Sequence, residues 1–184
     1  MPRTEKKIYL SFDDGPHPMV TPFVLDLLKK HNARATFFCI GKNVEAYPEV
    51  YRRILAEGHS VGNHTYHHPN GARTSVEEYL EDVRKAAAVI DSKLFRPPYG
   101  RIKKSQHKKI LQDLGMKTVM WSVLSGDFDE RLSGDQCCNN ALKLVNTGSI
   151  VVFHDSEKAW QRLSFCLPRL LERCTSLGYC FDKI

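Results

Sequence analysis

The chain of 184 residues is 42% hydrophobic and 26% charged, which is typical of a globular protein with a core, and we expect one domain over residues 1–184. Its 27 basic and 21 acidic side chains give a net charge of +6, but the basic pairs at 52–53, 103–104 and 108–109 fall on exposed helix patterns, so we expect no nucleic-acid partner. The sequence contains neither an apolar run of transmembrane length nor a signal peptide, so we expect a cytoplasmic location, with a trimmed secreted chain as the alternative.

Apolar β-type runs alternate with amphipathic helical patterns along the whole chain. Strands are predicted at 8–12, 35–40, 60–63, near 94, and at 117–123, 149–153 and 179–181. Helices are predicted at 21–32, 47–57, 75–91, 103–114, 134–146 and 161–176. Thr21 is the expected N-cap of the first helix, Ser75 and Glu78 form a capping-box pattern, and Gly115 is a stop signal. This alternation predicts an α/β fold with parallel strands, either an open doubly wound sheet or a barrel.

The six cysteines form no CxxC motif. Cys39 lies in an apolar run and is interpreted as a small core residue. We predict that the cysteines are reduced and structural, which suits a cytoplasmic protein. A disulfide among Cys166, Cys174 and Cys180 is the alternative.

Two adjacent acids, Asp13 and Asp14, follow the first predicted strand and precede Gly15 and Pro16. They therefore lie at the carboxyl end of a strand, where α/β sheets and barrels place their ligands. Because neighbouring residues on an extended segment point in opposite directions, one carboxylate could bind a metal while the other handles a proton. The alternative is a solvated Asp-Asp-Gly turn.

His64 and His68 are four residues apart, so on a helical turn both could bind one metal ion. His67 offers a competing pair with His64, and surface histidines beside the turn at 69–71 are the alternative. A carboxylate would complete a set of three ligands with an open fourth position, which is typical of a catalytic zinc.

Further polar residues follow predicted strands, and in a barrel they would converge on one face. They are Arg96, Asp127 and His154. Taken alone, Arg96 could be a surface arginine and His154 a satisfied core histidine.

Five motifs occur in the order and spacing of a known family: residues 11–15 (SFDDG), 64–68 (HTYHH), 96–100 (RPPYG), 121–128 (WSVLSGDF) and 151–154 (VVFH). On these motifs the chain resembles the polysaccharide deacetylase family, also called the NodB-homology domain or carbohydrate esterase family 4. The resemblance implies a distorted (β/α)7 barrel. It also implies a hydrolase that removes N-acetyl groups from an amino sugar, such as a chitooligosaccharide or the peptidoglycan glycan, by attack of a metal-bound water.

The resemblance implies that Asp14, His64 and His68 are the ligands of a divalent metal. Zinc suits this ligand set, and cobalt, nickel or iron would fit it as well. The implied partner is an acetylated carbohydrate, and a monomer is the default expectation.

The resemblance also assigns the catalytic groups. Asp13 looks like the general base and His154 like the general acid that protonates the departing amine. Arg96 is similar to the arginine that positions the base, and Asp127 to the carboxylate that orients the histidine. The backbone N–H of Tyr99 would help to hold the oxyanion.

The sequence departs from the family pattern at several wall positions. Leu124 stands where an acid is often found, and Phe128 replaces a tryptophan, so Asp127 orients His154 with Asp129 as a possible substitute. Val151 and Phe153 replace the leucines that usually line the acetyl pocket. An O-acetyl esterase or a cyclic amide hydrolase on the same scaffold is the first alternative function. A catalytically silent carbohydrate-binding domain is the second.

Overall fold

The computed structural model describes residues 6–184, whose strands form one sheet in which every pairing is parallel. Strand β1 (Lys6–Asp13) lies centrally, and the strand order is β5-β4-β3-β2-β1-β7-β6. The other strands are β2 (Thr36–Cys39), β3 (Ser60–Asn63), β4 (Leu94–Phe95), β5 (Lys117–Thr118), β6 (Val123–Leu124) and β7 (Ile150–His154). Strand β8 (Tyr179–Asp182) pairs with the first half of β1.

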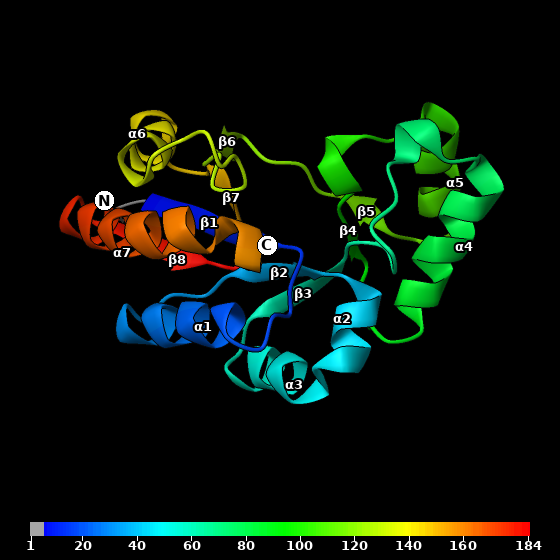
Figure 1. The fold of residues 1–184 in the computed structure, drawn as a ribbon, viewed down its shortest axis with the longest axis horizontal. Helices are drawn as coiled ribbons and strands as arrows, with labels where there is room; N and C mark the ends of the chain where they lie inside the picture. The colour runs from blue at the N-terminus through cyan, green and yellow to red at the C-terminus, as the bar shows by residue number, and fades with distance from the viewer. Residues whose placement is uncertain (1–5) are drawn as a thin grey trace, which may run out of the picture.

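Helices pack around the outside of this curved sheet (Figure 1). Helix α4 lies beside α5 at one end of the molecule, and α6 lies beside α7 at the other. The bounds are α1 (Val20–Lys30), α2 (Gly41–Ala46), α3 (Pro48–Ala56), α4 (Val76–Ala87), α5 (Lys104–Leu114), α6 (Gly134–Leu144) and α7 (Trp160–Ser176). The structure confirms the predicted parallel α/β barrel, which takes the form of a curled half-barrel. Among residues 6–184, no helix is long and apolar enough to cross a membrane.

The predicted strand at 117–123 is wrong as one element, because it consists of two short strands on opposite edges of the sheet. Val119 still bonds to β4 through its N–H to Phe95 O (2.8 Å), whereas Ser122 N–H already donates to Ile150 O of β7 (3.0 Å). The segment between them thus crosses the open side of the half-barrel. A local hydrophobic pattern cannot reveal this crossing, because it depends on which distant strands are paired.

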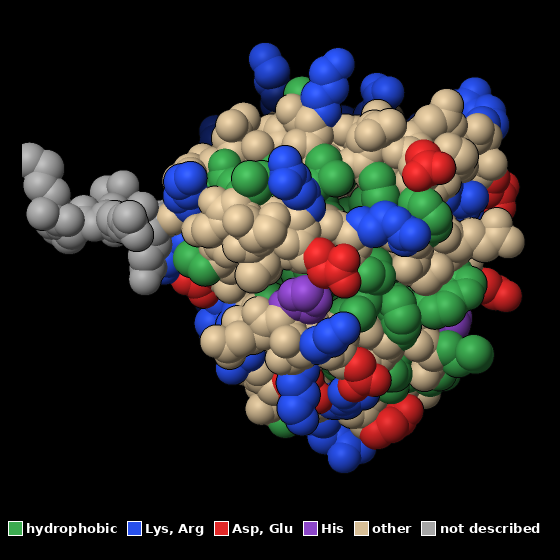
Figure 2. Space-filling view, turned by 90° about the vertical axis from the view of Figure 1, so that its left-hand side faces the viewer, with side chains coloured by type: hydrophobic (Ala, Val, Ile, Leu, Met, Phe, Trp, Pro, Cys, Tyr) green, Lys and Arg blue, Asp and Glu red, His purple; other side chains and the backbone are tan. Residues whose placement is uncertain are grey.

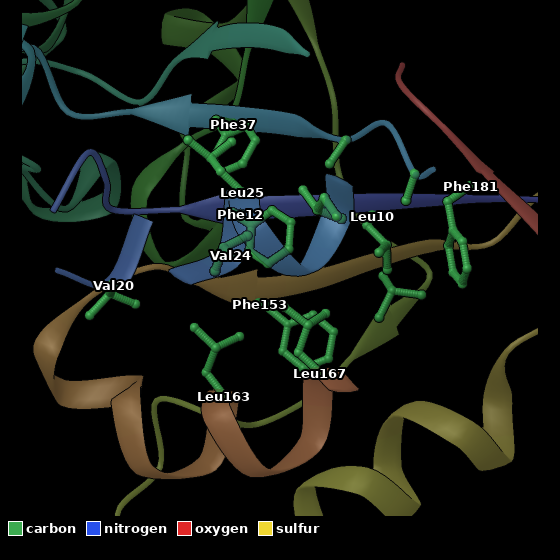
Figure 3. Packing of buried hydrophobic residues seen from close by; sticks show 14 of the residues in the cluster. Leu10, Phe12, Val20, Val24, Leu25, Phe37, Phe153, Leu163, Leu167 and Phe181 are labelled. Carbon is green, nitrogen blue, oxygen red and sulfur yellow. The ribbon is translucent and has the colours of Figure 1, made fainter. Parts of the chain in front are cut away.

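Period-two alternation on β1 separates the core from the site. Ile8, Leu10 and Phe12 are fully buried beneath α7, and Figure 3 shows Phe12 beside Phe37 and Phe153, with Leu163 and Leu167 of α7 facing them. The Phe12 ring centroid lies 5.0 Å from that of Phe37 and 6.1 Å from that of Phe153. Burying each such ring contributes roughly 1.5–3 kcal/mol. Ser11 and Asp13 consequently face the other side of the sheet.

The predicted helices are present, although several begin or end at residues other than those predicted. Helix α1 begins at Val20, after Met19, so Thr21 is not its N-cap. The Thr21 hydroxyl instead accepts a hydrogen bond from His17 N–H (2.8 Å) and donates one to Asp155 (2.5 Å). The capping box of Ser75 and Glu78 is confirmed at the start of α4, and Gly115 ends α5 in the left-handed conformation. The six-residue α2 was not predicted, since a helix this short carries little periodicity.

The cysteines form no disulfide; all six lie within the described residues. Cys39 is a fully buried core residue, as predicted. Cys166 contacts Cys137 and Cys138 between α6 and α7, and burial raises the pKa of the Cys174 thiol to about 11. The single-domain extent over 1–184 stays a prediction.

His59 is expected to make stability depend on pH. Its Nδ1 accepts a hydrogen bond from Ala35 N–H (3.2 Å), and burial lowers its pKa from 6.5 to about 4, with the charge of Arg34 adding to the effect. Between these two values the unfolded chain binds a proton that the folded chain does not, so the stabilising contribution is complete above pH ~6.5 and is lost as pH falls towards 4. We expect a loss of roughly 1–2 kcal/mol across this window in urea unfolding. In His59→Asn, whose amide oxygen can accept the same hydrogen bond, this part of the slope should vanish. An identical slope in both proteins would contradict the assignment.

Candidate active site and metal centre

The strand ends bring most of the predicted site residues to one cavity of about 410 Å³ at the carboxyl edge of the sheet. Arg96 and Asp127 do not line this cavity but bond to Asp13 and His154, which do. Its polar lining consists of Asp13, Asp14, His64, His68 and His154, together with Lys158. Its apolar lining comes from Tyr99, Trp121, Leu124, Phe128 and Val152. Acidic, imidazole and aromatic groups from strands far apart in sequence therefore meet at one place.

Asp14, His64 and His68 form a candidate metal centre, because one ligand atom of each lies within 4.8 Å of the others. Asp14 Oδ1 lies 3.6 Å from His64 Nε2 and 3.2 Å from His68 Nε2. His64 Nδ1 lies 2.7 Å from Arg96 O, which can only accept, so Nδ1 carries the proton and Nε2 presents a lone pair towards Asp14. Burial lowers the pKa of His64, which favours this neutral form.

These residues fit a divalent cation. Asp14 Oδ1 is buried and finds no hydrogen-bond partner among the described residues. A buried anionic oxygen that faces an imidazole lone pair is costly unless a positive charge lies between them. Burial raises the pKa of the Asp14 carboxyl, but contact with His68 and the charge of His154 outweigh it and hold this pKa well below its usual range.

Asp13 points into the same cavity and pairs with a buried arginine. Asp13 Oδ1 accepts from Arg96 Nη1 at 2.8 Å, and both side chains are almost completely buried. The same nitrogen donates to Ser11 Oγ (2.8 Å), and the Arg96 guanidinium also donates to the carbonyl oxygens of Val119 (3.1 Å) and Met120 (3.4 Å). Arg96 is therefore not a surface residue, and it fixes the orientation of the Asp13 carboxylate.

His154 is held by Asp127 from two sides. Its Nδ1 lies 2.8 Å from Asp127 Oδ1, and its backbone N–H donates to Asp127 Oδ2 at 2.7 Å. Burial lowers the pKa of His154, but the charge and the hydrogen bond of Asp127, with Asp14 and Asp13 beyond, raise it to about 9. Since Nδ1 is bound, Nε2 is the nitrogen available to a substrate. Asp129 is not the partner, because its carboxylate pairs with Arg131 at 2.8 and 2.9 Å.

The structure changes two of the residues that the sequence analysis placed in the wall of the cavity. Val151 and Phe153 do not line the cavity: both are fully buried on the helix-facing side of β7, and Val152 lines the cavity instead. The reason is the alternation of β7, which places 152 and 154 on one face and 151 and 153 on the other. Leu124 and Phe128 do line the cavity, and the Phe128 ring packs edge-on against His154 with centroids 5.1 Å apart.

Tyr99 lies in the short 3-10 turn Pro98–Gly100 with a left-handed φ of 59°. Its ring is 63% exposed and packs against His68 with centroids 4.6 Å apart. Tyr99 thus lies beside the metal centre, and the oxyanion role of its N–H stays a prediction.

Asp155 was missed by the sequence analysis. Its carboxylate is buried and accepts from Gly15 N–H (3.1 Å) and from Thr21, and its own N–H donates to Asp13 O (3.0 Å). A Cβ on Gly15 would lie 2.1 Å from Asp155 Oδ2, so glycine is required at this close approach. Asp155 ties β7 to the turn that carries Asp14, and only its place after His154 could have drawn attention to it.

A half-barrel in which three side chains could hold a metal beside a carboxylate and an imidazole is an arrangement that metal-dependent hydrolases use. Comparison with known proteins agrees: the polysaccharide deacetylase family model matches residues 1–119. A peptidoglycan-N-acetylglucosamine deacetylase of Bacillus cereus is 39% identical over 161 residues, covering 84% of this chain. The chain belongs to the polysaccharide deacetylase family.

Two further similarities cover most or all of the chain. A chitooligosaccharide deacetylase of Azorhizobium caulinodans is 36% identical over 160 residues, which are 83% of this chain and 75% of that protein. The crystal structure of the peptidoglycan N-acetylglucosamine deacetylase Bc1960 superposes with a TM-score of 0.91 at 34% identity, over 100% of this chain and 88% of that one. The match to the first Bacillus cereus relative covers 58% of that protein's length. Members of the family are metal-dependent.

Proposed function

We propose that this chain is a metal-dependent amidase that removes N-acetyl groups from the amino sugars of a glycan, such as a chitooligosaccharide or the peptidoglycan glycan. The proposal is carried by one observation: the Asp14, His64 and His68 trio shares its cavity with an arginine-held carboxylate and an aspartate-held imidazole. Amide hydrolysis needs these parts, since an amide is unreactive towards neutral water and an amine leaves only when protonated.

Asp14, His64 and His68 would hold the metal, which we propose to be zinc because two imidazoles and a carboxylate suit it; cobalt, nickel or iron could use the same ligands. When bound there, such an ion supplies Lewis acidity, which lowers the pKa of water to about 7 and polarises an acyl oxygen. The backbone carbonyl of Arg96 orients His64, and the orphaned oxygen of Asp14 supplies the anionic ligand.

Asp13 acts as the general base that takes a proton from the attacking water. Arg96 holds the Asp13 carboxylate in place at the cavity through the 2.8 Å contact of Nη1. Electrostatic support of this kind is worth more in a buried site than in water. A positioned base of this type contributes roughly 10²–10⁴-fold to the rate.

His154 acts as the general acid that gives its Nε2 proton to the departing amine. With the pKa of His154 raised to about 9, the imidazolium is the form present at neutral pH. Asp127 holds the ring through Nδ1, which leaves Nε2 facing the cavity. The Tyr99 N–H, in the turn beside His68, donates to the oxyanion of the tetrahedral intermediate.

The aromatic wall fits a sugar ring, because Tyr99, Trp121 and Phe128 offer flat apolar faces at the mouth of the cavity. On the face drawn in Figure 2, Lys and Arg side chains are scattered among acidic and apolar ones rather than gathered in one patch. This mixed distribution gives no sign of a polyanion-binding patch on that face. Cytoplasmic location and a monomeric state stay predictions, to be tested by fractionation and light scattering.

An O-acetyl esterase or a cyclic amide hydrolase is the second candidate, because Leu124 and Phe128 depart from the family pattern and both line the cavity. Acetate release from N-acetylglucosamine oligomers should be measured beside release from an O-acetylated glycan of matched length. We expect acetate and free amine in equal amounts from the first and at least a tenfold lower rate from the second. Faster release from the ester would favour the esterase, and release from neither would favour a silent carbohydrate-binding domain.

A further inference from the structure

The loop that carries the two metal-ligating histidines is an unusual piece of backbone. Thr65 and His68 both lie in the left-handed region, with φ values of 66° and 62°. This conformation is costly for a β-branched residue such as threonine, so it persists only where the surrounding structure holds it. The contacts that hold residues 64–68 therefore determine how well the two imidazoles are placed.

Four successive backbone N–H groups of this loop donate to side-chain oxygens. Thr65 N–H donates to Asn63 Oδ1 (2.8 Å) and His68 N–H to Thr65 Oγ1 (3.0 Å), which are local contacts. The middle two N–H groups, of Tyr66 and His67, both donate to Asp82 Oδ1, at 2.7 and 2.9 Å. Asp82 belongs to α4, so the centre of the loop is held by a distant element.

His67 completes this arrangement. Its Nδ1 lies 2.6 Å from Asp82 Oδ2, so each oxygen of the Asp82 carboxylate is engaged by the loop. The Asp82 side chain is only 13% exposed, whereas the His67 side chain is 57% exposed and does not line the cavity of the metal centre. Charged acceptors form shorter and stronger bonds to N–H groups than neutral ones do, so Asp82 is well suited to hold two of them.

We infer that Asp82, with His67 locking its carboxylate, is a positioning device that holds the 64–68 loop in its metal-binding conformation. The inference rests on the proposed metal centre, and it assigns to Asp82 an influence on the metal affinity of that centre. Asp82 touches neither metal nor substrate; it acts by keeping His64 and His68 at the separation that one cation requires. His67, which offers a rival ligand pair on sequence spacing alone, thereby has a different task.

The test is metal affinity, measured with Zn²⁺ and Co²⁺ alone by titration calorimetry and by the visible absorption of the cobalt protein. Asp82→Ala removes the shared acceptor and should raise Kd by ~10–100-fold, with an altered cobalt spectrum, because partners behind the ligands typically matter by that amount. In Asp82→Asn the amide oxygen still accepts from both N–H groups, so Kd should rise less than about tenfold. Glu81→Ala, one residue earlier on the same helix with its carboxylate 3.9 Å from Arg84, is the matched control and should bind like the wild type.

His67→Ala leaves the two backbone N–H donors and their Asp82 acceptor intact and should raise Kd by a few-fold. This variant carries the test if Asp82→Ala does not fold. Circular dichroism of the metal-free variants separates loss of the fold from loss of positioning. The inference is overturned if Asp82→Ala binds cobalt as tightly as the wild type with the same spectrum, if Glu81→Ala weakens binding equally, or if His67→Ala has no effect. A wild type that binds neither ion overturns the metal centre, and this inference with it.

Discussion

Asp13→Asn is expected to reduce kcat for deacetylation by roughly 10²–10⁴-fold while the protein keeps its metal. The amide retains an oxygen that can accept from Arg96 Nη1, now 2.8 Å from the carboxylate, but it cannot take a proton from water. The metal content should not change, because Asp14, His64 and His68 are untouched. Steady-state kinetics and metal analysis on the same preparation measure both quantities.

The buried Arg96 loses its counter-charge in this variant, so its stability must be controlled. Circular dichroism at the assay temperature reports whether the variant is folded. Ser11→Ala is the matched control: it removes the other side-chain hydrogen bond of the same Nη1 atom, also 2.8 Å long, and should keep most of the turnover. If Asp13→Asn were folded, metal-bound and still active, Asp13 would not be the base.

Asp14→Ala is expected to lose both metal and activity. Asp14 is the only acidic residue of the trio, and its Oδ1 lies within 3.6 Å of both imidazole nitrogens, so its removal leaves two neutral ligands. We expect metal affinity to fall by more than the ~10–100-fold that is typical for partners behind the ligands. Elemental analysis after dialysis and acetate release measure the two losses.

Backbone strain needs a separate variant, since Asp14 has a left-handed φ of 81° that alanine disfavours. Asp14→Asn tolerates this conformation and lacks only the negative charge, so it should also bind metal poorly. Asp113→Ala, which removes an exposed carboxylate on α5, should bind metal like the wild type. Full metal content in both Asp14 variants would place the metal elsewhere.

Much of the fold followed from local signals. The capping box at Ser75, the stop at Gly115 and the buried run that became β1 are properties of short segments, so the sequence predicted them correctly. The strand at 117–123 was wrong because its halves pair with β4 and β7 on opposite edges of the sheet. Thr21 failed as a cap because its hydroxyl bonds to Asp155, more than a hundred residues away.

The same division applies to the site. The predicted metal ligands, base and acid meet in one cavity because each follows a strand end, and strand ends can be read from sequence. Two residues that hold the loops around the site could not be found in this way. Asp155 and Asp82 act through contacts with Gly15 and with the N–H groups of Tyr66 and His67, and no spacing rule relates these positions. The wall residues were misassigned at Val151 and Phe153, where the register of β7 decides which side faces the cavity.

Metal-dependent amide hydrolysis is tested most directly by one measurement on one preparation. Acetate and free amine released from N-acetylglucosamine oligomers are quantified before chelation, after chelation, and after zinc is returned. We predict equal amounts of acetate and amine, near-complete loss of release on chelation, and recovery with about one zinc per chain, as a single three-ligand site requires. Release that survives removal of the metal, or a zinc-loaded protein that releases no acetate, would contradict the proposed function.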